Sequence, residues 1–383
     1  MNLLDKIFKP TIKANRVVSK IIDQYQYRVS NDISNYKRAL KLAENGDRSR
    51  LILLYKEALR DNHLSGIIDL RKERILGTEF RIIDSDNNIY NDTYKFKSKW
   101  FYEFLSMFMC EIYYGFSLIQ IDGIKNDNII RVSQVPFENV KIETGELIPN
   151  IYQPYDTISY LSDTYYKWLL EVINDRTNLG LLADIVPLTI WKRSTMSAWA
   201  EYTEIFGMPI RIGKTTSMVE ADRQRLANFL KGLAKSAWAV LDENESIEFV
   251  ENNNSDAFNV YDKFIDRING EISKRIIGGT EITDSHSGSG YAQSSTHNDQ
   301  FSLKIKSDLR RLEFYINAVL FPKLVNLNVI PDGLKFKFDT FENLSLLDQI
   351  KIDSELGKIY PLDKDYLETK YRTKFTNNAS SME

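Results

Sequence analysis

The residues that most suggest chemistry lie in Gly207–Thr216, where a glycine is followed by Gly213-Lys214-Thr215. Such a loop cradles nucleotide phosphates when four residues separate its first glycine from the Gly-Lys pair. Here five residues, Met208 to Ile212, lie between them, and no apolar helix follows the lysine directly. We therefore interpret Lys214 as a surface residue of a turn and predict no nucleotide site.

A second candidate is the segment Gly278–Tyr291, which combines serines with His286 and is followed by His297. Ser/His catalysis needs a rigid elbow and an orienting acid, and a Gly/Ser loop cannot hold positions to about half an ångström. The chain has three histidines and one cysteine, Cys110. These show no metal-ligand spacing and exclude an internal disulfide. We predict no enzyme, no metal and no cofactor.

The segment must be positioned by the helices that flank it. Before it, apolar residues recur at spacings of three and four, which predicts a helix over 256–277 with Asp256 as N-cap. Gly278-Gly279 ends this helix, because glycine adopts the left-handed conformation freely. After it, a second helix is expected over about 295–320. A loop of this length inside a compact domain is usually functional.

An earlier helical stripe is predicted from Pro187, which suits a first turn, to Gly207. Between the two long helices, residues 208–255 change character. They predict strands over 209–212, 238–241 and 246–250 and a helix over 219–233, a small α/β insertion. Two long helices that bracket such an insertion resemble a column with a head.

Residues 31–186 predict an α+β domain. Helices are expected over 32–44, 48–60, 63–76 and 97–114, and strands over 79–84, 116–121, 129–132, 140–143 and 157–161, with Asp122-Gly123 as a hairpin turn. The helix 97–114 has a wide aromatic stripe, which we expect to contribute to contacts between subunits. A strand over 335–338 and helices over 345–356 and 364–373 complete the chain.

The composition is that of a globular protein, with 43% hydrophobic and 27% charged residues. Fifty basic and fifty-three acidic residues give a net charge of −3. A protein that grips nucleic-acid phosphates usually has a basic excess, so contact with DNA is expected to be loose or local. No apolar span of about twenty residues occurs, and we expect an intracellular protein that does not enter a membrane.

Several stretches in order resemble Mu-like bacteriophage portal proteins. They are Asn62-His63-Leu64 with Arg71-Lys72 and Leu76-Gly77, then Tyr114-Gly115-Phe116, then Trp191–Phe206 with Gly207–Gly213, then Glu271–Thr280 with His297-Asn298. The resemblance covers roughly residues 35–375. Gly279 stands where the family often has glutamine, which does not alter the architecture.

The resemblance implies a portal fold with named parts. These are an N-terminal arm (1–30), an α+β wing (31–186), stem helix 1 (187–207), an α/β clip (208–255), stem helix 2 (256–277), a tunnel loop (278–296), a long helix and strand returning to the wing (297–339) and a helical crown with the C-terminal tail (340–383). Without the resemblance, the α+β class and the helix–insertion–helix order are the parts that the residues indicate.

Three groups of site residues follow from this assignment. The tunnel loop would line a DNA channel with Gly278, Gly279, Thr280, Glu281, Ser287, Gly288, Ser289, Gly290 and Tyr291. The clip would bind partners through Arg211, Lys214, Arg223, Lys231 and Trp238. The stem and subunit interface would use Trp191, Trp199, Tyr202, Tyr261, Ile265, Ile268 and Ile272.

The resemblance implies a homo-oligomeric ring, typically a dodecamer, at one capsid vertex of a virion that is assembled in the host cytoplasm. Double-stranded DNA would pass through it without sequence recognition during packaging and ejection. Terminase, the major capsid protein and head-tail connector proteins would be its partners. The alternative is a structural adaptor or scaffold of a phage-tail-like or gene-transfer particle that has no DNA channel. An ATP-hydrolysing packaging enzyme is a third, weaker reading.

Overall fold

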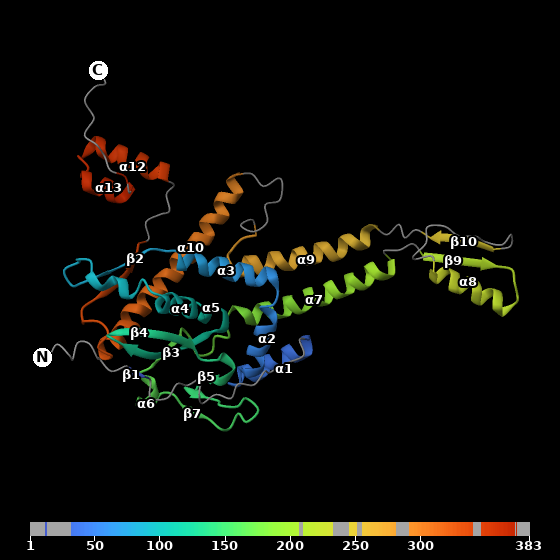
Figure 1. Cartoon of the computed structure of the whole chain (residues 1–383), viewed down its shortest axis with the longest axis horizontal. Coiled ribbons are helices and arrows are strands. Elements are labelled where there is room, and N and C mark those ends of the chain that lie inside the picture. The colour runs from blue at the N-terminus through green and yellow to red at the C-terminus, as the bar shows by residue number, and fades with distance from the viewer. Residues whose placement is uncertain are drawn as a thin grey trace, which may run out of the picture. The chain divides into compact units, whose positions relative to one another are not determined.

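The computed structural model describes residues 12–13, 32–206, 210–232, 245–250, 255–280, 291–339, 346–371 and 373. The predicted strand 238–241 and the greater part of the tunnel-loop segment lie outside these residues. The chain forms two compact units, Met1–Gly77 with Arg81–Lys337, and Thr78–Phe80 with Phe338–Glu383. The first unit contains the elements that the candidate site uses (Figure 1).

Three helices open the first unit: α1 (Ile33–Glu44), α2 (Ser49–Ala58) and α3 (Asn62–Leu76). Asp32 begins α1 as predicted, because its carboxylate accepts from the Asn35 N–H at 2.9 Å. Asp61 does the same for α3 by accepting from the Leu64 N–H at 3.0 Å. Such caps satisfy N–H groups that have no partner inside the helix.

The central sheet is built on one long strand. β3 (Phe116–Lys125) pairs antiparallel with β4 (Asn128–Gln134), β8 (Leu169–Ile173) and β1 (Ile12–Lys13). The predicted hairpin turn at Asp122-Gly123 is wrong, because β3 continues through it with a bulge. The chain turns instead at Asn126 and Asp127, which both have positive φ, 52° and 56°, as a tight hairpin turn requires.

Shorter elements surround this sheet. They are β2 (Phe80–Ile83), the 3₁₀ turn Asn91–Lys95, α4 (Lys99–Phe108), α5 (Cys110–Tyr114), the 3₁₀ turn Phe137–Asn139, β5 (Val140–Lys141), β6 (Glu146–Leu147), β7 (Ile158–Ser159) and α6 (Asp163–Tyr166). β5, β6 and β7 form a small antiparallel sheet. β1, β6 and β8 were not predicted from the sequence.

The aromatic stripe of the predicted helix 97–114 faces the interior of its own chain. Trp100, Phe101, Phe104 and Phe108 are each 4% exposed or less. They pack with one another and with the rings of other elements, such as Phe96 beside Phe101 at 5.3 Å between centroids. The expectation that this stripe contributes to subunit contacts is therefore wrong, because intrachain packing already covers it.

Two long helices, α7 (Leu181–Phe206) and α9 (Ser255–Ile276), pack against each other (Figure 1). Between them in the chain lie β9 (Ile210–Thr215), α8 (Glu220–Gly232) and β10 (Glu245–Val250), with β9 and β10 antiparallel and α8 packed on β9. An added Cβ at Gly213 would lie 2.8 Å from a methyl carbon of Leu230. The glycine therefore lets α8 approach the strand closely.

The helix α7 begins at Leu181, upstream of the predicted start at Pro187. Proline inside a helix leaves the carbonyl four residues earlier without an N–H partner. Here that carbonyl belongs to Ala183, and the Tyr36 hydroxyl of α1 donates to it at 2.9 Å. This tertiary hydrogen bond satisfies the carbonyl that Pro187 leaves without a helical partner.

After the tunnel-loop segment the chain forms α10 (Tyr291–Tyr315), a π-helical turn (Ile316–Leu320), α11 (Phe321–Asn326) and β11 (Lys335–Phe338). The predicted loop boundary at 296 is wrong, because residues 291–296 are already helical. In the sequence these residues have no apolar stripe, the signal from which the helix was predicted. The second unit contains α12 (Leu346–Ile359) and α13 (Lys364–Tyr371).

Two glycines allow the backbone to cross itself closely just before α7. Gly115, at the entrance to β3, and Gly180, just before α7, both have positive φ and touch each other's chain segments. A Cβ on Gly115 would lie 2.0 Å from the Asn178 carbonyl oxygen, and one on Gly180 would lie 2.3 Å from the Tyr113 carbonyl oxygen. Only glycine fits at either position.

Candidate functional site

The candidate site is the place where α9 ends and the tunnel-loop segment begins. The Ile277 N–H donates to the Ser273 carbonyl at 2.8 Å, and the Gly278 N–H donates to the Lys274 carbonyl at 3.1 Å. Gly278 has a φ of 92°, so the predicted glycine stop of this helix is confirmed. Ile272, Ile276 and Ile277 are fully buried, which fixes this end of the helix in the core.

Cationic side chains from three elements gather at this helix end. Arg71 of α3 donates from Nη1 to the Ile276 carbonyl at 2.7 Å. Lys304 of α10 donates to the Arg275 carbonyl at 3.1 Å. Arg275 itself forms an ion pair with Asp184 of α7 at 2.6 Å. Carbonyls at a helix C-terminus lack intrahelical partners and carry partial negative charge, so they attract cations.

The Arg71 side chain also pairs with a carboxylate. Its Nε and Nη2 donate to the two oxygens of Asp308 on α10, at 2.8 and 3.0 Å. The two side chains are only 7% and 4% exposed. A bidentate pair of this kind is both strong and directional.

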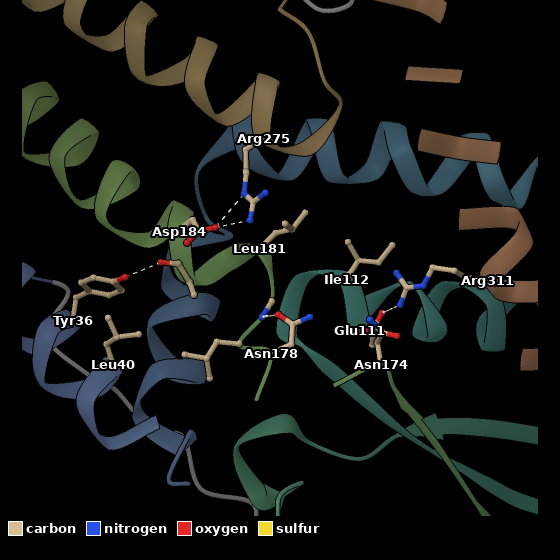
Figure 2. A pocket seen from close by; sticks show the side chains of 13 residues that line it. Tyr36, Leu40, Glu111, Ile112, Asn174, Asn178, Leu181, Asp184, Arg275 and Arg311 are labelled. Atoms are coloured by element: carbon tan, nitrogen blue, oxygen red, sulfur yellow. Dashed lines mark hydrogen bonds and ion pairs between the residues drawn. The ribbon is translucent and has the colours of Figure 1, made fainter. Parts of the chain in front are cut away.

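A polar cavity of about 400 Å³ adjoins the helix end, lined by Tyr36, Leu40, Glu111, Ile112, Asn174, Asn178, Leu179, Gly180, Leu181, Ala183, Asp184, Arg275 and Arg311. Figure 2 shows the Asp184–Arg275 pair on one side and the Glu111–Arg311 pair on the other. Each arginine that faces the cavity is thus already bound to a carboxylate.

Glu111 is the most buried charged group of this cavity, with 1% of its surface exposed. Arg311 donates to its carboxylate at 2.5 Å. Burial raises the pKa of the Glu111 carboxyl above its ordinary value, and Arg311 opposes this shift. The pair links α5 to α10 and neutralises itself, so the cavity carries little net charge.

The described part of the chain brings no three of His, Cys, Asp and Glu together as metal ligands. His63 lies on α3, and its Nε2 is 2.9 Å from the Ser273 hydroxyl and 3.0 Å from the Asn269 carbonyl. It therefore connects α3 to α9. None of the described helices has the length and the apolar run that crossing a membrane requires.

The predicted tunnel-loop residues divide into two groups. Gly278, Gly279 and Thr280 follow α9 directly, and Tyr291 is the first residue of α10. Glu281, Ser287, Gly288, Ser289 and Gly290 lie outside the described residues. The structure thus gives the two ends of the segment.

The predicted clip residues are placed in part. Lys214 is exposed on β9, opposite Ser246 of β10. Arg223 of α8 donates to the Ser217 carbonyl at 3.2 Å and so holds the loop before the helix. Beside it Met218 is 88% exposed. Arg211 lies on β9 and Lys231 on α8, with their side chains outside the description, and Trp238 lies outside the described residues.

The predicted stem residues fall into exposed and buried groups. Trp191 is 47% exposed. Trp199 stacks on Tyr261 with 6.3 Å between ring centroids, and Tyr202 also contacts Tyr261. Ile265 is half-buried.

Ile268 and Ile272 are 3% and 0% exposed in the core of their own chain. A subunit interface through these two side chains is therefore excluded. Apolar periodicity identifies the buried face of a helix, and here that face packs within the chain.

Sequence reasoning missed Arg71, Lys304 and Asp308 as members of the site. The sequence does contain a signal for Arg71 and Asp308. Arg71 follows Leu64, Ile67 and Ile68 at helical spacing, and Asp308 sits between Ile305 and Leu312 on the apolar face of α10. Charged residues on apolar faces are buried only when they are paired.

The chain matches a known protein family and a curated relative. Residues 52–373 match the family described as the portal protein of Mu bacteriophage. The Mu-like prophage FluMu protein gp29 of Haemophilus influenzae is 27% identical over 197 residues, which cover 47% of this chain and 37% of that protein. The match thus spans well under half the length of this curated relative.

Two solved structures have a similar fold. A chain in the virion of a native gene transfer agent particle has a TM-score of 0.55 and 9% identity, and the match covers 90% of this chain and 100% of that one. A chain in the neck of the native particle, computed with C12 symmetry, has a TM-score of 0.52 and 9% identity, with 88% and 98% covered. At these identities the likeness concerns the fold alone.

Proposed function

Since the chain belongs to the portal protein family of Mu bacteriophage, we propose that its copies form a ring at one vertex of a capsid. DNA would enter through this ring during packaging and leave through it at ejection. The observation that carries the proposal is the arrangement of α7 and α9. These paired helices leave and re-enter the core on either side of the β9–α8–β10 insertion, as the stem and clip of a portal would.

In this proposal, residues 31–186 form the wing, α7 and α9 the stem, residues 208–255 the clip and residues 340–383 the crown. The segment after α9 is the tunnel loop that meets the DNA. The clip is the docking site for terminase during packaging and for head-completion and tail proteins later. The wing and its surroundings contact the major capsid protein, and the protein is part of the virion.

The size of the ring is also a proposal. A chain of similar fold occurs in a particle neck that was computed with C12 symmetry, and we propose a dodecamer here. Apolar side chains of the outer parts of α7 and α9 supply a contact surface. Trp191 and Met196 are 47% and 50% exposed, and Val260 and Phe264 are 67% and 44% exposed. Apolar clusters of this kind commonly mark protein contacts.

The charges at the candidate site support a channel that lets DNA slide. Arg71 is bound to Asp308, Arg275 to Asp184, and Lys304 to helix carbonyls. These cations are therefore already engaged and are poor partners for phosphates. Since phosphate neutralisation dominates DNA affinity, a surface of this kind would touch DNA without holding it.

The proposal is tested in cells that produce the particle, with and without the gene for this chain. Loss of the chain should leave capsids that contain no DNA, and the wild-type gene supplied in trans should restore filled particles. Gold-labelled antibody against the chain should mark one vertex of each intact particle. DNA-filled particles in the absence of the chain would refute the proposal.

A further inference from the structure

The last turn of α9 is held by side chains from both α3 and α10. Arg71 donates one N–H to the Ile276 carbonyl and two to the Asp308 carboxylate. Lys304, one helical turn before Asp308, donates to the Arg275 carbonyl. We call Arg71, Lys304 and Asp308 the α9 anchor.

The α9 anchor lies where the tunnel-loop segment begins. The segment leaves α9 after Ile276 and joins α10 at Tyr291, so the anchor connects the helix before it to the helix after it. Arg71 lies on a third element, α3, whose N-terminal turn contacts the same stretch of α9 through His63. The start of the segment, at the C-terminal end of α9, is thus fixed to α3 and α10.

A contribution to folding stability does not by itself explain why the anchor contains a buried ion pair. Burying an ion pair often contributes no more to folding than well-packed apolar residues would, because both charges lose their hydration. Arg71 and Asp308 are among the most buried charged residues in the described chain. The pair makes the contact directional. The bidentate hydrogen bonds to Asp308 fix the plane of the Arg71 guanidinium and so orient its Nη1 toward the Ile276 carbonyl.

We propose that Arg71, Lys304 and Asp308 are positioning residues that fix the C-terminal end of α9, where the tunnel-loop segment begins, against α3 and α10. Force that passing DNA exerts on the segment would then reach α3 and α10 and would not unwind the end of α9. The inference rests on the proposed function, because it takes the segment to be the part of the ring that meets DNA.

The inference is tested with assembled rings of three variants. Lys304→Met removes one donor to α9 from a partly exposed position, where folding should tolerate the change. Lys304→Arg restores a cation and serves as the rescue. The double variant Arg71→Met with Asp308→Leu replaces the ion pair with apolar groups of similar size. The control, Asp184→Asn, weakens the nearby exposed pair with Arg275 and leaves the anchor intact.

The first measurement is hydrogen exchange of a peptide that covers Ile277 and Gly278. We expect exchange to be roughly tenfold faster or more in Lys304→Met and in the double variant, the factor that a hydrogen bond from a charged donor represents. Lys304→Arg and Asp184→Asn should exchange like the wild type. Unchanged exchange in Lys304→Met would overturn the anchor even if the double variant fails to fold.

The second measurement is packaged DNA length against time with the same rings. We expect Lys304→Met to stall more often than the wild type, and Lys304→Arg to recover. Faster exchange with wild-type packaging would overturn the positioning role and leave the portal function in place. If wild-type rings pass no DNA at all, the proposed function fails, and the exchange result still decides whether the anchor holds α9.

Discussion

The inner and outer parts of the α7–α9 helix pair differ in what covers them. In the inner part, residues 181–190 and 268–276, Leu182, Ile185, Val186, Ile272 and Ile276 are completely buried. In the outer part, residues 191–206 and 255–267, large apolar side chains remain exposed in the single chain. Both parts lie on the same two helices, so helix propensity does not account for the difference in burial. The difference indicates that the inner part belongs to the folded core of the chain, while the outer part leaves apolar area exposed, the surface that we propose for contacts between subunits.

The strongest test of this difference removes one buried side chain from the inner part. Ile272→Ala should lower the free energy of unfolding by about 2–5 kcal/mol, because it loses burial and leaves a cavity. Val260→Ala, on the outer part of the same helix, should change it by less than about 0.5 kcal/mol. Urea denaturation of unassembled protein measures both. Equal losses would show that the two parts are not distinct.

The complementary test concerns assembly. Val260→Asp combined with Phe264→Asp should leave the unassembled chain folded and weaken subunit association by about 2 kcal/mol or more per contact, since exposed apolar area would no longer be buried. Sedimentation velocity over a range of concentrations measures the shift from rings to monomers. Asp262→Asn on the same helix is the matched control. Normal rings from the double variant would move the subunit interface away from this surface.

A smaller effect is expected where α1 supports the start of α7. Tyr36→Phe removes the hydrogen bond to the Ala183 carbonyl and should cost about 1 kcal/mol of stability. Tyr102→Phe, at an exposed tyrosine of α4, is the control. In a Pro187→Ala background the helix regains its own N–H donor, so the Tyr36→Phe cost should shrink. An undiminished cost there would show that Pro187 is not the reason for this contact.

The smallest expected effect is a pH dependence at a buried cation. Lys323 of α11 donates to the Tyr166 carbonyl at 2.7 Å and to the Leu169 carbonyl, and its Nζ lies 4.1 Å from the Tyr166 ring centroid. Burial lowers the pKa of Lys323 from 10.5 to about 8. Between pH 8 and 10.5 the unfolded chain therefore holds the proton more often than the folded chain, and stability rises with pH.

Lys323→Met should remove this rise, whereas Lys99→Met, at an exposed lysine, should leave it unchanged. Denaturation midpoints at pH 7.5, 9 and 10 make the comparison. If the wild type and Lys323→Met show the same slope, the burial of Lys323 does not depress its pKa.

Much of the inner part could be predicted from the sequence. The spacing of apolar residues from Phe258 to Ile276 and the glycines that follow predicted α9 nearly to its ends, although Asp256, the predicted N-cap, is already inside the helix. The helix predicted over 32–44 is α1. Apolar periodicity succeeds at such places because one helix face is buried against the core. The portal family was identified from ordered short motifs.

The errors have physical causes that local sequence does not contain. Asp122-Gly123 has the composition of a tight turn, yet the sheet carries β3 past it as a bulge, and Asn126-Asp127 turns instead. The helix α7 continues through Pro187, and the hydroxyl that donates to the freed Ala183 carbonyl belongs to Tyr36, which lies far away in the chain. Arg71 pairs with Asp308, and the sequence around neither residue indicates that the other is its partner. Such pairings arise only when the fold is complete.

The central claim, a portal ring whose channel is lined by the segment after α9, is tested most directly by an electron-microscopy reconstruction of the purified, assembled protein. The account predicts a closed ring in which Thr280 and Tyr291, the described residues nearest the segment, face the central channel. It also predicts that the outer parts of α7 and α9 contact a neighbouring subunit. Monomers at every concentration, or a ring with Thr280 and Tyr291 on its outer surface, would contradict it.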